Sequence, residues 1–172
     1  MTTLHYPSPQ FPGLPSVAID VPEGWEPVRA PGTTMAAKLG REGAFSPNVV
    51  VSVEECVPAY DVQTSFAQIR QMAESRDGAI SEPYSADLDG RPFVGCDATW
   101  PDPDVETILQ ANLFCVVPTQ ADAAHLIQVT GAVGGATAEV DYELVRQVIM
   151  TTRVTSWDGT RAAGPEGGDA SA

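Results

Sequence analysis

The residues of this chain that could do chemistry begin with acids gathered at one predicted hairpin turn. Asp102, Asp104 and Glu106 stand close together, and Asp97 precedes them. Carboxylate oxygens suit Ca²⁺, but the run lacks the spaced series of ligands that a known calcium loop requires. Asp and Pro are also typical of a solvated turn, because Asp bonds its own backbone and Pro presets φ. We therefore expect a turn here and no metal.

A glycine-rich stretch and a histidine are two further candidates. Residues 131–135 read Gly-Ala-Val-Gly-Gly between a predicted strand and a predicted helix, where phosphate sites often form. The stretch does not match G-x-G-x-x-G and no lysine follows, so it predicts a chain reversal. His125 lacks any motif that would supply a nucleophile and an orienting acid. We expect a structural histidine, a protein that is not an enzyme, and no cofactor.

The remaining candidates lie on three predicted antiparallel strands, at residues 91–100, 105–117 and 125–133. Side chains alternate between the two faces of a strand, so one face of this meander is apolar and the other is mixed. The mixed face carries aromatic, amide, hydroxyl and carboxylate groups: Phe93, Asp97, Gln110, Asn112, Phe114, Gln128 and Thr130. Aromatic rings for contact and amides for specificity are typical of a binding surface. A half-exposed sheet face that is merely wet would show the same mixture, and both interpretations stay open.

The first hairpin of the meander predicts its own register. Centring the turn on residues 101–104 places Trp100 opposite Val105 and Cys96 opposite Leu109. The same register places Val94 opposite Ala111 and sets Phe93 beside Asn112 on the mixed face. The apolar face then holds Pro92, Val94, Cys96, Trp100, Leu109, Ala111, Leu113, Ile127, Val129, Gly131 and Val133. A slip of one residue would exchange the two faces.

Other segments must flank this meander. Strands are predicted at residues 16–21, 34–39, 48–56 and 79–88, where β-branched and apolar residues alternate. A first helix follows Asp61, a predicted N-cap, with an apolar side chain on each turn.

A last helix is predicted from Thr137 to about Thr151. Its predicted apolar stripe is Val140, Leu144, Val145, Val148 and Ile149. The short Gly134-Gly135 connection should fold this helix back onto the meander, with Ala111 and Gly131 allowing a close approach.

Length, composition and charge bound the class of protein. The chain has 172 residues with nine basic and twenty-three acidic residues, a formal charge of −14. Such a surface repels nucleic acid and anionic membranes, so we expect neither as a partner. The sequence has no apolar run of the ~18 residues that a membrane span needs, and its start does not resemble a signal peptide. We expect no membrane insertion and a cytoplasmic protein.

The chain is expected to form one domain over residues 11–157, with a flexible arm at residues 1–10 and a disordered tail at residues 158–172. The three cysteines are Cys56, Cys96 and Cys115. The predicted register puts the last two on one face but ~20 Å apart, beyond disulfide reach, so free thiols are expected.

A family resemblance rests on three stretches of the sequence. They are the strand and turn Ile19-Asp20-Val21-Pro22-Glu23-Gly24-Trp25, the valine-rich residues 48–54, and the closing helix at residues 138–151. Together they resemble the LpqN-type proteins of actinobacteria, within the PsbP and Mog fold group. The resemblance implies an α+β fold, with an antiparallel meander sheet flanked by helices in an α/β/α sandwich. It also implies a binding role without catalysis, often in exported lipoproteins, although this chain has no lipobox.

Two hypotheses for function follow. The first is a non-enzymatic binding module that docks a protein partner, and a second copy of the chain is one candidate partner. The alternative is a carrier of a small apolar ligand or lipid, with a pocket between sheet and helix. A cavity lined by Phe93, Phe114 and Ile108 would favour the carrier, whereas a flat surface would favour the protein partner.

Overall fold

The computed structural model describes residues 3–119 and 122–158. Its centre is an eight-stranded sheet in the order β2-β3-β4-β9-β8-β7-β5, with β6 also paired to β7, and every pair is antiparallel. The strands are β2 (Trp25–Val28), β3 (Met35–Leu39), β4 (Asn48–Cys56), β5 (Ala79–Ile80), β6 (Tyr84–Leu88), β7 (Arg91–Asp102), β8 (Glu106–Pro118) and β9 (Ala124–Gly134). A separate small sheet pairs β1 (Ser16–Ala18) with β10 (Arg153–Thr155).

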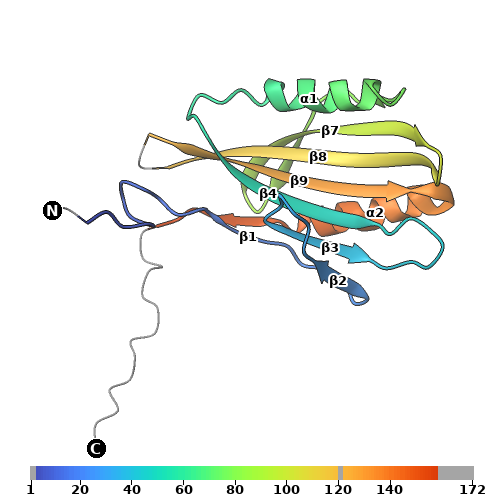
Figure 1. Cartoon of the computed structure of the whole chain (residues 1–172), viewed down its shortest axis with the longest axis horizontal. Helices are drawn as coiled ribbons and strands as arrows, with labels where there is room; N and C mark the ends of the chain where they lie inside the picture. The colour runs from blue at the N-terminus through green and yellow to red at the C-terminus, as the bar shows by residue number, and fades with distance from the viewer. Residues whose placement is uncertain (1–2, 120–121, 159–172) are drawn as a thin grey trace, which may run out of the picture.

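Helices cover both faces of the large sheet. Helix α1 (Gln63–Glu74) lies over β7 and β5, and α2 (Ala138–Met150) lies across β9, β4 and β8 on the other side (Figure 1). A 3₁₀ turn, η1 (Gly135–Thr137), connects β9 to α2. The predicted α+β fold, an antiparallel meander flanked by helices, is therefore confirmed. We call the two sides of the sheet the α1 face and the α2 face.

The larger core lies on the α2 face. Val145, Val148 and Ile149 of α2 are at most 2% exposed and pack on the sheet. Gly131 permits this close packing, because a Cβ atom there would lie 2.1 Å from Cγ1 of Val145. The predicted close approach at Gly131 is confirmed. Val140 is 75% exposed, so its place in the apolar stripe was wrong.

Two smaller clusters form under α1. Phe66 meets Phe114 edge-on, with ring centroids 5.7 Å apart, and Cys96 is buried beside them. The second cluster joins Ala73 of the helix to Trp100 and other residues of the sheet. Each helix therefore has its own core, and the sheet separates the two.

The predicted register between β7 and β8 was wrong. Val94 pairs with Phe114 rather than Ala111, and Cys96 pairs with Asn112 rather than Leu109. The turn starts later than expected: the Asp102 carboxylate accepts hydrogen bonds from the backbone N–H groups of Asp104 and Val105, and Asp102 pairs with Glu106. The pairing thus moves by an odd number of residues, which exchanges the faces of one strand relative to the other.

This correction moves several side chains. Val94, Cys96 and Trp100 lie on the α1 face, while Leu109, Ala111 and Leu113 lie on the α2 face with Ile127 and Val129 as predicted. Cys96 and Cys115 therefore occupy opposite faces rather than the same one, and both thiols are free. The sheet itself keeps them apart.

Smaller differences lie outside the meander. The strand predicted at residues 16–21 is only β1, and it pairs with β10, which was not predicted. The strand predicted at residues 79–88 is divided into β5 and β6 around Glu82-Pro83, because Pro lacks the N–H that a ladder needs. Thr137 occupies the N-cap position of α2, but its hydroxyl donates to Asp141 instead of capping a backbone N–H.

The predicted tail lies outside the described residues except for Asp158, and so do Met1 and Thr2 of the predicted arm. Among the described residues, no helix has the length and apolar character to cross a bilayer.

Candidate functional site

The structure divides the predicted binding residues between the two faces. Gln110, Asn112, Phe114, Gln128 and Thr130 share the α1 face, on neighbouring strands β8 and β9. Phe93 and Asp97 lie on the α2 face, because β7 pairs in a different register from the predicted one. The predicted neighbours Phe93 and Asn112 are thus on opposite sides of the sheet.

The amides and hydroxyl of the α1 face form a hydrogen-bonded cluster. Asn112 is fully buried, and its side-chain oxygen accepts from the Thr130 hydroxyl at 3.2 Å. The Gln128 amide donates to the Thr130 hydroxyl at 3.1 Å and lies 3.5 Å from the Asn112 oxygen. Asn112 and Thr130 are directly paired across β8 and β9. A buried amide satisfied in this way positions Gln128, which is half-buried at the surface.

A groove runs beside this cluster because α1 lies over β7 and β5 and leaves β9 and β4, on the other side of β8, open on this face. We call it the α1 groove; its volume is about 300 Å³. It is lined by Glu54, Glu55, Cys56, Tyr60, Ser65, Gln68, Ile69, Phe114, Leu126 and Gln128. Its floor comes from β8 and β9, one wall from β4, and the other from α1 and the segment before it.

The floor of the α1 groove is apolar and its rim is acidic. Phe114 and Leu126 are at most 9% exposed, whereas Glu54 is exposed at the rim. Glu55 follows it on β4 and points to the α2 face, beside His125. None of the lining residues is Lys or Arg, so nothing among them neutralises the Glu54 carboxylate. The Tyr60 hydroxyl is held by that of Ser65 at 2.9 Å. The arrangement suits a ligand with an aliphatic or aromatic body and a positive charge.

A different arrangement surrounds Asp97 on the α2 face. The Tyr84 hydroxyl donates to one carboxylate oxygen at 2.8 Å, and the Tyr142 hydroxyl donates to the other at 2.5 Å. Burial, followed by the bond to Asp97, raises the pKa of both tyrosines well above the usual range. The three residues tie β6, β7 and α2 together. Asp97 is thus a structural anchor in this geometry rather than a free binding group.

Phe93 is fully buried in the core under α2. The cavity that would favour a carrier needed Phe93, Phe114 and Ile108 to line one space. The structure separates them into three different clusters, on two faces of the sheet.

His125 is buried on the α2 face at the start of β9, opposite Glu55 of β4. Burial lowers the pKa of this imidazole, and the nearby Glu55 charge partly opposes the shift. Among the described residues, no group of His, Cys, Asp and Glu gathers in a way that could hold a metal ion.

Sequence reasoning missed the contributions of Tyr60, Gln68 and Ile69 to the groove. The helical pattern that includes Ile69 predicted a helix but not its place on the sheet, and Tyr60 lies before that helix. The position of α1 over β7 and β5 depends on how the helix packs on the sheet, and the pattern of a single sequence does not predict that packing. Tyr84 and Tyr142 were missed for a related reason, because they meet Asp97 only when β7 has its actual register.

Comparison with known proteins bears on the fold. No protein-family model matches the chain, and no curated protein matches its sequence. Among solved structures it is similar to LpqN of Mycobacterium tuberculosis, described as involved in cell envelope biogenesis, with a TM-score of 0.63 and 15% identity over 90% of each chain. It is also similar to the cyanobacterial PsbP (CyanoP) of Synechocystis sp. PCC 6803, with a TM-score of 0.50 and 13% identity over 90% of this chain and 98% of that one.

A protein of unknown function from Pseudomonas aeruginosa, named a putative regulator, matches more weakly. Its TM-score is 0.43 with 14% identity over 80% of this chain and 81% of that one, and it supports no argument. Identities this low do not place the chain in an actinobacterial family and carry no activity across. What they establish is that the chain has a distant form of the fold seen in LpqN and PsbP.

Proposed function

We propose that the protein is a non-enzymatic binding module that docks a protein partner in the α1 groove. The observation that carries this proposal is the groove itself, which is open to solvent, has an apolar floor and presents a positioned amide, Gln128, beside it. Interfaces typically combine a desolvated apolar centre with a polar rim. Phe114 and Leu126 supply the first, and Glu54 with Gln128 supplies the second.

The charge of the groove indicates what kind of segment it takes. Glu54 stands at the rim with no lining cation, in a chain whose formal charge is −14. A partner segment with Lys or Arg beside an apolar residue would match both features, because complementary charge speeds encounter and excludes acidic competitors. The proposed partner is therefore a protein with a basic surface segment.

The carrier remains the second candidate, and its predicted pocket between sheet and helix has room only on the α1 side. On the α2 side, the hollow beside Tyr84, Ala111 and Arg146 measures only about 20 Å³, which is room for a water molecule. The α1 groove, at about 300 Å³, is at the lower end of small-molecule sites. An open groove of this size fits one or two side chains of a partner better than an enclosed lipid.

Cys56 gives a direct test, because it lines the groove while Cys96 and Cys115 are buried. A benzophenone maleimide attached to Cys56 should cross-link the partner in an extract of the host cells. Glu54→Lys should reduce the yield of that product, since it reverses the charge of the rim. Glu74→Lys makes the same charge change at the exposed end of α1, outside the groove, and should not reduce the yield.

A second labelling site tests whether cross-linking depends on the position of the probe. In a Cys56→Ser background, Gln147→Cys places the same probe on the exposed side of α2, on the opposite face. Equal cross-linking from both positions, or a yield that Glu54→Lys leaves unchanged, would contradict docking in the groove. A small molecule retained in native mass spectrometry and displaced by the label on Cys56 would favour the carrier instead.

A further inference from the structure

An uncharged, apolar segment stands out on this acidic chain. We call residues 3–15 the arm. No Asp, Glu, Lys or Arg occurs in the sequence before Asp20. Half of the large apolar side chains exposed among the described residues belong to the arm: Leu4 at 72%, Tyr6 at 70%, Phe11 at 44% and Leu14 at 49%. Apolar side chains gathered in this way usually mark an interaction surface.

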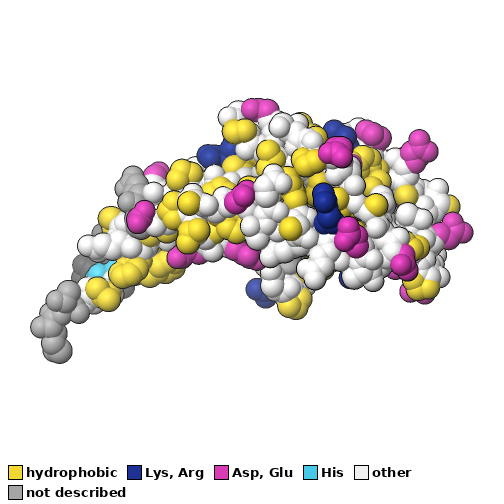
Figure 2. Space-filling view, turned by 90° about the horizontal axis from the view of Figure 1, so that it is seen from above, with side chains coloured by type: hydrophobic (Ala, Val, Ile, Leu, Met, Phe, Trp, Pro, Cys, Tyr) yellow, Lys and Arg dark blue, Asp and Glu magenta, His cyan; other side chains and the backbone are white. Residues whose placement is uncertain are grey.

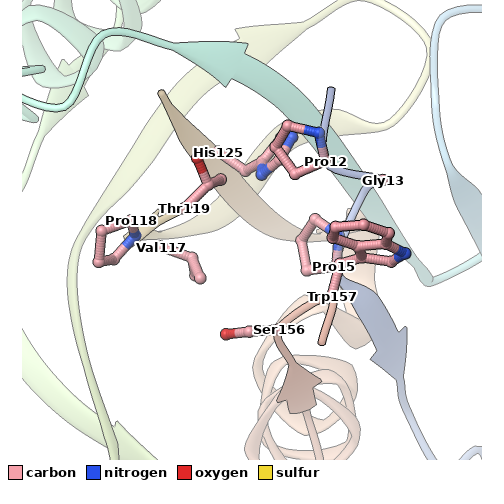
Figure 3. Close-up of a pocket in the computed structure, with 9 residues that line it drawn as sticks. All are labelled: Pro12, Gly13, Pro15, Val117, Pro118, Thr119, His125, Ser156 and Trp157. Carbon is pink, nitrogen blue, oxygen red and sulfur yellow. The ribbon is translucent and has the colours of Figure 1, made fainter. Parts of the chain in front are cut away.

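The base of the arm is anchored to the body of the protein. Gly13 and Pro15 are buried, and a Cβ atom at Gly13 would lie 2.9 Å from Cδ1 of Trp157, so only glycine allows this approach. Figure 3 shows Gly13 and Pro15 beside the Trp157 indole and Pro12 beside His125, with Val117 and Pro118 on the other side of the hollow at the end of the sheet. A shallow hollow of about 20 Å³ remains between these residues.

The outer part of the arm has a restricted shape. Ser8 and Phe11 exchange backbone hydrogen bonds of 2.8 and 3.0 Å, and prolines at positions 7, 9, 12 and 15 limit φ along the segment. A segment restricted in this way loses little further entropy when it docks. It therefore holds Tyr6 and Phe11 outwards without much cost from ordering. Figure 2 shows hydrophobic side chains along this narrow end of the molecule.

Charge indicates which partner would use this surface. A basic partner would be drawn to the acidic body, which includes the α1 groove, and would gain nothing from an uncharged arm. Another acidic molecule would be repelled by the body and could approach closely only where charge is absent. A second copy of this chain meets both conditions, since it is equally acidic and brings the same apolar arm.

We propose that the arm, together with Val117, Pro118 and Trp157 at its base, is the surface on which a second copy of the chain docks. The contact is isologous: Leu4, Tyr6 and Phe11 of each copy pack against the arm and its base in the other. The base of the arm and the α1 groove share no lining residue.

Sedimentation velocity of the full chain tests the proposal over concentrations from about 1 µM to about 1 mM, the range of weak to moderate affinity. The unmodified chain should form a dimer within this range. Phe11→Asp should raise the dissociation constant at least about tenfold, because it places a carboxylate in an apolar contact. Val140→Asp is the matched control: Val140 is 75% exposed on α2, and this variant should dimerise normally.

Two further measurements separate this interface from other contacts. Raising the salt concentration should tighten the dimer, since the two acidic bodies repel one another and apolar arms do not depend on ion pairs. A photo-cross-linking residue at position 11, in a mixture of isotope-labelled and unlabelled chains, should mark the arm and its base in the other copy. A chain that stays monomeric throughout, equal weakening by Val140→Asp, or cross-links that fall in the α1 groove would each overturn the proposal.

Discussion

At the scale of single residues, polar side chains inside this protein are paired rather than free. Asp97 accepts a hydrogen bond from Tyr84 and one from Tyr142, and Asn112 is bonded to Thr130. Both groups were predicted to form part of one binding surface. The two groups differ in their hydrogen-bond partners. Both carboxylate oxygens of Asp97 accept from tyrosines, whereas the cluster around Asn112 ends in Gln128, which lines the α1 groove.

The two tyrosines predict how stability depends on alkaline pH. In the folded chain their pKa values are raised above the usual value near 10, mainly by burial and then by Asp97. Below about pH 10 the hydroxyls are protonated in both states, and their contribution to stability is fully present. As the pH rises above about 10, only the unfolded chain ionises, so the free energy of unfolding should fall.

The measurement is urea unfolding at a series of pH values from about 8 to about 11.5. The double variant Tyr84→Phe/Tyr142→Phe should be less stable at neutral pH, yet its stability should fall less steeply above about pH 10. The buried thiols, whose pKa values are also raised, contribute to the slope in both proteins and cancel in the comparison. Identical slopes would mean that the tyrosines ionise as freely in the folded chain as in the unfolded one.

Replacing Gly131 with a larger residue should lower the stability of the protein. A Cβ atom there would lie 2.1 Å from Cγ1 of Val145 and 2.8 Å from Cδ1 of Ile149. Gly131→Ala should therefore destabilise the protein by about 1–3 kcal/mol, because α2 must move away from β9. Gly40→Ala is the control, since the nearest atom to its added Cβ is Glu26 Oε1 at 3.5 Å. Thermal unfolding of both variants distinguishes them, and equal melting temperatures would show that α2 yields without cost.

At the scale of elements, the sequence predicted the residue ranges of the strands better than the pairing between them. Residues 48–56 form β4 as predicted, because alternation and β-branching are local properties. The β7–β8 register failed at one turn, where Asp102 starts the turn after the strand has continued through Pro101. The pairing of β1 with β10 joins two segments of three residues each, which are too short to carry a periodic signal.

The candidate site shows the same limit. The sequence could group five residues because β8 and β9 are consecutive strands whose face assignments were correct: Gln110, Asn112, Phe114, Gln128 and Thr130. Phe93 and Asp97 were assigned to the wrong face by the β7 register. The groove wall from α1 depends on how a helix docks on a sheet, and a single sequence carries little information on that.

An ion pair connects two elements that are distant in the sequence. Asp141 lies in the first turn of α2, is 1% exposed, and pairs with Arg41 from the β3–β4 connection. The Thr137 hydroxyl donates to the second Asp141 oxygen at 2.6 Å. A carboxylate near the start of a helix also interacts favourably with the helix dipole. This pair fixes the start of α2 against the far end of the sheet.

Asp141→Ala should lower the free energy of unfolding by roughly 3 kcal/mol, because it leaves a partly buried guanidinium without its partner. Asp20→Ala provides the comparison, since Asp20 forms a two-bond pair with Arg153 in an exposed setting. Water screens that pair, and its loss should leave stability nearly unchanged. Chemical unfolding of the two variants measures the difference. Similar losses for both would show that burial adds nothing to the Arg41 pair.

At the scale of the whole molecule, the sheet separates two cores of unequal size. The α2 face carries one large cluster, which includes Phe93, Val129, Val145 and Ile149. The α1 face carries two small clusters, and the α1 groove lies beside them. A layer held by few contacts opens at a lower free energy than the rest of the structure. The side that carries the proposed binding groove is thus also the side more easily opened.

The cysteines report this difference directly, because each lies in a different place. Cys56 lines the α1 groove, Cys96 is fully buried under α1, and Cys115 is 6% exposed on the α2 face. Burial raises the pKa of Cys96 to about 11 and that of Cys115 in the same direction, so neither thiol reacts readily in place. Cys56 should be alkylated in the native protein, and the other two only after an opening.

Exposure alone would make Cys115 the more reactive of the two buried thiols. The smaller cores under α1 predict the reverse. Cys96 should react first, at denaturant concentrations well below the unfolding midpoint, because displacing α1 uncovers it. Cys115 should react only with global unfolding, since the large core must come apart to reach it. Pulse alkylation followed by peptide mass spectrometry, across a urea series, gives both free energies of opening. If Cys115 reacts before Cys96, or both follow the global transition, then α1 is not the weaker layer.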